Sequence, residues 1–116
     1  MKVILIDPEN QTVTVINIEK GNEAIYKAMD CTTFCCPIEY DNNDTLFADD
    51  EGLFKAQKGG VLMDNWEYPI LGKILIIGCN PEIGSSIGVK SKVKFFTDQI
   101  RWVNEKEAEA YRARYN

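Results

Sequence analysis

Histidine is absent from this chain of 116 residues. Its absence excludes histidine-activated nucleophiles, histidine-ligated metals and the side chain that most often serves as a general base near neutral pH. Enzymes that work with carboxylates alone remain compatible with the composition. The balance favours a protein that is not an enzyme, and we predict no catalytic residue and no cofactor.

Long apolar runs are also absent. The longest run near the middle, residues 74–77, is much too short to cross a bilayer. The apolar opening at residues 1–6 is ended by Asp7 and Pro8, too early for the core of a signal peptide. These two features predict a cytoplasmic protein with no membrane partner.

Cysteine pairs with the spacing of a zinc knuckle are missing as well. The four cysteines are Cys31, Cys35, Cys36 and Cys79, whereas a structural zinc site favours two Cys-x2-Cys pairs. Cys35 and Cys36 are adjacent, so on a strand they would point to opposite sides. We expect free thiols in a reducing compartment and no bound metal.

What is present is the composition of an ordinary globular protein. Apolar residues make up 45% of the chain and charged residues 27%. The length predicts a single domain over residues 1–116 with one core. The net charge of −5 disfavours direct nucleic-acid binding and favours partners with a basic surface.

Hydrophobic periodicity and turn formers predict the order of elements. Asn22 is expected to cap the first helix, Pro37 to mark an edge strand or a bulge, and Asn104 with Glu107 to form a capping box. Strands are expected at 1–6, 13–18, 32–40, 43–49, 53–55 and 71–78, helices at 23–29, 90–99 and 105 to about 114, an excursion at 58–60 and 63–66, and an extended link at 101–103. Phe34, Cys36 and Ile38 should share one strand face. The fold class is α+β: a mainly antiparallel sheet of about five to six strands with helices packed on it and a C-terminal helical segment.

The most informative stretch is residues 43–55, interpreted as a hairpin with an acidic tip. Gly52 is expected to close its turn in the left-handed conformation. A calcium loop is excluded, because Leu46 stands where glycine is required and Gly52 where the bidentate glutamate is required. The tip is either a solvated turn or an electronegative contact surface for a basic partner. Trp66, Tyr68 and Trp102 form either core or rim packing or an exposed binding patch. The candidate partner-binding residues are Asp44, Asp49, Asp50, Glu51, Trp66 and Tyr68.

A second candidate site follows the apolar strand at 71–78. The loop after it contains Gly84, Ser85 and Ser86 and is expected to lead into a helix, so its backbone N–H groups are suited to an anion. The spacing is not that of a Walker motif, and Glu82 would oppose a phosphate. The candidate ligand-binding residues are Asn80, Gly84, Ser85 and Ser86.

Three segments carry a family resemblance. They are MKVILIDP at 1–8, DTLFADDEGL at 44–53 and PILGKILIIG at 69–78. Together they resemble a family of small phage and mobile-element proteins that is catalogued only as a domain of unknown function. The resemblance brings no catalytic residues. It implies an accessory protein that is made by a bacteriophage or prophage and acts inside a bacterium.

Two functions of different classes follow. The first is a protein that binds and inhibits a bacterial host factor, as anti-defence or anti-CRISPR proteins do. The second is a protein that binds or sequesters a small ligand, such as a nucleotide signal, through the loop at 80–88 and the interface of a homo-oligomer. An enzyme with carboxylate chemistry ranks last.

Overall fold

The structure is a computed structural model, and it describes residues 1–64 and 66–115. Asn65, part of the expected excursion, lies outside the described residues. The fold is α+β, as the sequence predicts. The elements are β1 (Lys2–Asp7), β2 (Thr12–Asn17), α1 (Asn22–Met29), β3 (Phe34–Glu39), β4 (Asp44–Asp49), β5 (Gly60–Met63), β6 (Ile70–Leu71), β7 (Ile74–Cys79), β8 (Ser86–Ile87), α2 (Val93–Thr97), β9 (Ile100–Val103) and α3 (Glu105–Tyr115).

The main sheet has six strands in the order β2-β1-β7-β4-β3, with β8 paired to the end of β7. Every pairing in it is antiparallel. The apolar run at 71–78 is divided at Gly72, whose φ of 92° only glycine adopts readily, so that β6 and β7 join different sheets. As predicted, β7 is central, and its residues from Ile74 to Gly78 are buried.

A second sheet of three strands has the order β6-β5-β9. Of the expected excursion at 58–60 and 63–66, the described residues Lys58, Gly59, Asp64 and Trp66 lie outside the strands, but Gly60 and Met63 are the ends of β5. The expected link at 101–103 is extended, as predicted, but it is part of the paired strand β9. Gly60 in β5 pairs with Leu71 on one side and Val103 on the other. Strands this short are stabilised by pairing with segments far away in sequence, so their local pattern alone does not identify them.

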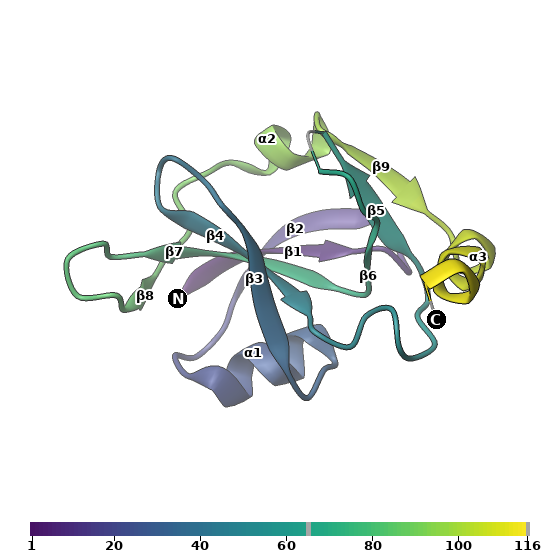
Figure 1. Cartoon of the computed structure of the whole chain (residues 1–116). Coiled ribbons are helices and arrows are strands. Elements are labelled where there is room, and N and C mark those ends of the chain that lie inside the picture. The colour runs from purple at the N-terminus through teal and green to yellow at the C-terminus, as the bar shows by residue number, and fades with distance from the viewer. Residues whose placement is uncertain (65, 116) are drawn as a thin grey trace.

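Alternation along the strands divides the core between the two faces of the main sheet. Leu75 and Ile77 face α1, where they pack with Ile25. Ile74 and Ile76 point to the opposite face of the main sheet, where they belong to the core cluster that includes Val61 of β5 and Phe96 of α2. Figure 1 shows α1 on one side of the main sheet and α2, β5 and β9 on the other.

The helix boundaries confirm some predictions and correct others. In α3 the capping box is present: the Glu107 N–H donates to Asn104 Oδ1 at 2.8 Å, and the Asn104 N–H donates to Glu107 Oε1 at 3.3 Å. Asn22 is not an N-cap, because it is the first residue of α1 and Gly21 precedes it without a side-chain cap. The helix expected at 90–99 is only the short α2.

Strand β3 lies at a sheet edge and carries a bulge between Cys35 and Ile38, as Pro37 predicts. The bulge reverses the alternation of side chains. Phe34 therefore packs on the α1 face and Ile38 on the opposite face, and the prediction that they share a face is wrong.

The acidic hairpin is also a wrong prediction. Strand β4 ends at Asp49, and the expected strand at 53–55 is instead a series of turns. Gly52 does not have a positive φ. Glycine is required there for a different reason, since a Cβ atom would lie 2.9 Å from the Leu71 carbonyl oxygen.

Candidate functional site

An exposed acidic and aromatic loop follows β4. This segment, residues 50–54, is called the acidic loop below. Asp50 and Glu51 are exposed, and the Phe54 side chain beside them is 69% exposed. Two carboxylates and a phenyl ring on consecutive turns are the groups that bind a basic surface with an apolar recess. Sequence analysis missed Phe54 because it placed that residue inside a second strand.

The Asp49 side chain anchors this loop from beneath. Only 2% of that side chain is exposed, and its carboxylate lies 2.8 Å from Lys55 Nζ. It also accepts the Glu51 N–H at 2.9 Å and Gln57 Nε2 at 3.3 Å. The hydrogen bond to Asp49 is the main reason that the pKa of Lys55 is raised above its usual value. Asp49 thus joins both ends of the loop and is not itself part of the acidic surface.

Further hydrogen bonds hold the loop to the segment before β3. The Asp50 N–H donates to the Thr33 carbonyl at 3.2 Å, and Thr32 Oγ1 donates to the Glu51 carboxylate at 3.0 Å. The Phe54 N–H closes a turn on the Glu51 carbonyl at 2.9 Å. The loop therefore presents its side chains from a backbone bonded at several points.

Asp44 lies at the other end of β4 and is fully buried. Its carboxylate accepts the Ser91 N–H at 2.7 Å, the Lys90 N–H at 3.0 Å and Asn42 Nδ2 at 3.2 Å. Burial on its own raises the pKa of Asp44, but these hydrogen bonds outweigh it and hold the pKa below the ordinary value. Asp44 fastens the segment before α2 to the main sheet, and the structure does not bring it together with the exposed carboxylates.

The predicted aromatic patch is divided between two environments. Trp66 is half-buried and packs on the face of the core that the second sheet covers. Tyr68 is exposed, and its ring meets the Tyr115 ring of α3 edge-on at 6.0 Å between centroids. Tyr68 is thus the more accessible of the two.

The predicted anion loop is a hairpin turn. It leads from β7 into β8 and not into a helix, so the expected strand–loop–helix arrangement is wrong. The Gly84 N–H donates to the Asn80 carbonyl at 2.7 Å, and the Glu82 N–H donates to Asn80 Oδ1 at 3.0 Å. The Ser85 carbonyl accepts the Asn80 N–H. These groups satisfy one another within the turn, whose tip carries Ile83.

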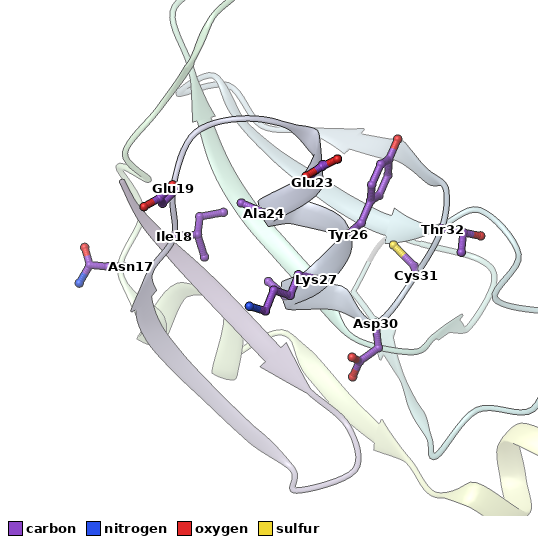
Figure 2. Close-up of a pocket in the computed structure, with 11 residues that line it drawn as sticks. Asn17, Ile18, Glu19, Glu23, Ala24, Tyr26, Lys27, Asp30, Cys31 and Thr32 are labelled. Atoms are coloured by element: carbon purple, nitrogen blue, oxygen red, sulfur yellow. The ribbon is translucent and has the colours of Figure 1, made fainter.

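A hollow of about 1100 Å³ lies along α1 and is open to solvent (Figure 2). Cys31 lines it, and burial, with a smaller contribution from Asp49, raises the pKa of that thiol. A raised pKa keeps the thiol protonated and weakly nucleophilic at neutral pH. Within residues 1–64 and 66–115, no three His, Cys, Asp or Glu side chains are grouped to hold a metal ion. Across the same residues, no helix combines the length and apolarity of a membrane span.

Residues 1–101 match the family described as Domain of unknown function (DUF3846). The chain belongs to this family. The match runs from β1 into β9, so it includes the acidic loop and leaves α3 outside. No curated protein and no solved structure matches the chain. Membership confirms the predicted match to a domain of unknown function, and the family description assigns no activity.

Proposed function

We propose that this protein binds and inhibits a bacterial host protein that has a basic surface, and that it does so without catalysis. The acidic loop is the observation that carries the proposal. The exposed Asp50 and Glu51 precede an exposed Phe54 on a backbone held by the buried Asp49 carboxylate. A bonded loop loses little conformational freedom on binding, so more of the contact energy appears as affinity.

The loop has two kinds of binding group with separate roles. A phenyl ring that enters a recess on a partner is the kind of anchor that dominates interface energies. Carboxylates at the rim steer a basic partner and accelerate encounter, and salt screens that effect. The net charge of −5 has the same sign as the loop. We therefore expect the association rate, which the carboxylates accelerate, to fall with salt. The contact made by the phenyl ring should depend little on salt.

The finer part of the proposal concerns origin and target. We propose a phage or prophage accessory protein that acts in the bacterial cytoplasm against a host defence, in the manner of an anti-CRISPR protein. The resemblance of the three sequence segments to phage and mobile-element proteins supports this part. The acidic loop supports only the coarser statement that a basic protein surface is bound.

A pull-down from bacterial lysate tests the coarser statement. The tagged protein is compared with Phe54→Ala and with the double variant Asp50→Asn, Glu51→Gln. Matched controls are Ile83→Ala, which removes an equally exposed apolar side chain at 75% exposure, and the double variant Asp64→Asn, Glu67→Gln, which removes two exposed charges elsewhere.

We expect a retained host protein that both loop variants lose and both controls keep. Kinetics with the recovered partner should show a slower on-rate at high salt for the parent and a weaker salt dependence for the charge variant. Equal retention by all variants would overturn the role of the loop. A nucleotide released on denaturation, seen by absorbance and mass spectrometry, would favour ligand sequestering instead.

A further inference from the structure

Strand β2 is an unprotected edge of the main sheet. It has six residues, Thr12–Asn17, with no charged side chain and no proline, and its register with β1 is unbroken. The other edges are blunted. Strand β3 has its bulge and Pro37, β6 has two residues, and β9 exposes Arg101. Long, flat and uncharged edges are the ones that pair with another strand.

The open backbone groups of β2 follow from its pairing with β1. Met1 and Ile18 exchange both hydrogen bonds, because the Ile18 N–H donates to the Met1 carbonyl and the Met1 amino group donates to the Ile18 carbonyl. In an antiparallel pair, bonded and non-bonded residues alternate. The N–H and C=O groups of Val13, Val15 and Asn17 therefore point away from β1. No residue in the described part of the chain pairs with them.

We infer that this edge is the interface of a homodimer in which β2 pairs antiparallel with β2 of a second copy. The three outward residues are evenly spaced about Val15. A two-fold axis there pairs Val15 with the partner's Val15, and Val13 with the partner's Asn17. This register satisfies all the outward groups with about six hydrogen bonds, two for each pair. It makes the edge complementary to itself.

The side chains fit a second copy. Because the strand is uncharged, self-pairing sets no like charges opposite each other, although each copy has a net charge of −5. Val15 is 51% exposed and would be covered by the partner's Val15 on the same face.

The hollow beside α1 reaches one end of this edge. Its lining includes Asn17 and Ile18 at the end of β2, together with Ala24 and Ala28 of α1. Figure 2 shows Ile18 on the side of β2 near Ala24 of α1, and the Asn17 side chain pointing away from the helix. A two-fold axis perpendicular to the sheet places the hollows of the two copies on the same side of one continuous sheet.

The dimer goes beyond the proposed function and does not depend on it. In the strand order β2 and β3 are opposite edges of the main sheet, and the acidic loop is bonded to the segment before β3. The acidic loops of a dimer are thus far from the seam.

Analytical ultracentrifugation over a range of concentrations tests the dimer. We expect a monomer–dimer equilibrium for the parent chain. Val15→Lys places two ammonium groups opposite each other and should raise the dimer dissociation constant at least about tenfold. Val15→Thr keeps a β-branched, uncharged residue and should leave it within a few-fold of the parent. A parent that stays monomeric at every concentration, or a Val15→Lys variant as dimeric as the parent, overturns the inference.

Cysteine trapping tests the register, and does so even if Val15→Lys fails to fold. The background is Cys36→Ser, which removes the exposed thiol. Directly paired residues lie about 5.5 Å apart at Cα, within reach of a disulfide. Val15→Cys should cross-link to itself on mild oxidation. Val13→Cys and Asn17→Cys should cross-link only when the two variants are mixed. Cross-linking of Val13→Cys alone, or none in any variant, refutes the proposed seam.

Discussion

Replacing Asp44 by asparagine is the most direct test of how the structure uses its buried charge. The carboxylate is fully buried and accepts hydrogen bonds from two backbone N–H groups, those of Lys90 and Ser91, and from the Asn42 side chain. An asparagine of the same size has one acceptor oxygen and turns an NH2 donor toward groups that also donate. At least one buried donor then loses its partner.

The cost follows from these contacts. A hydrogen bond to a charged group contributes roughly 1.5–3 kcal/mol, and an orphaned buried donor costs about 1–3 kcal/mol. We therefore expect Asp44→Asn to lower the free energy of unfolding by about 2–4 kcal/mol. Urea unfolding at neutral pH measures it as a lower midpoint with an unchanged slope. A loss below about 1 kcal/mol would refute the argument that this carboxylate fastens residues 90 and 91 to the sheet.

The same carboxylate predicts a dependence on acid. The pKa of Asp44 is lower in the folded chain than its ordinary value of 3.8, so folding favours the ionised form. Its contribution is complete above pH 3.8 and is lost as the pH falls below 3.8 through the folded-state pKa. The stability difference between the parent and Asp44→Asn should shrink as the pH is lowered through that window. A difference that stays constant with pH contradicts this assignment.

Three further substitutions test the acidic loop and the caps. Asp49→Asn should lower the free energy of unfolding by about 1–2 kcal/mol and should speed proteolytic cleavage within the loop. The loss is smaller than for breaking a fully buried ion pair, because the Lys55 ammonium group can be hydrated instead. Unchanged cleavage would show that Asp49 does not order the loop. Gly52→Ala should lower the free energy of unfolding by about 1–3 kcal/mol in urea titrations, because its Cβ would crowd the Leu71 carbonyl oxygen. A variant as stable as the parent would show that the backbone there shifts to make room. Asn104→Ala should lower the free energy of unfolding by about 1 kcal/mol in thermal melts, whereas Asn104→Ser should retain most of the stability because serine also caps helices. An alanine variant as stable as the parent would show that the capping box contributes nothing.

Local features could be predicted where the groups that determine them are close in sequence. The first hairpin follows from alternation in β1 and β2 and from the turn formers between them. The capping box joins Asn104 and Glu107, three residues apart, so the partners are visible together. Pro37 removes a backbone donor wherever it stands, and that alone predicts an edge strand or a bulge. These are properties of single residues or of near neighbours.

Only the tertiary structure decided which carboxylates are exposed and which are buried and hold neighbouring segments in place. Asp44, Asp49, Asp50 and Glu51 are chemically similar in the sequence, and all four were candidate partner-binding residues. The Lys90 and Ser91 amides that surround Asp44 come from 46 and 47 residues away. The same holds for β5, which exists as a strand because β9 pairs with it. Periodicity, caps and proline act within a few residues, so the sequence by itself determined the first hairpin, the capping box and the bulged edge strand. Burial and pairing depend on groups that chain folding brings together, so the tertiary structure decided the second sheet and the exposed site.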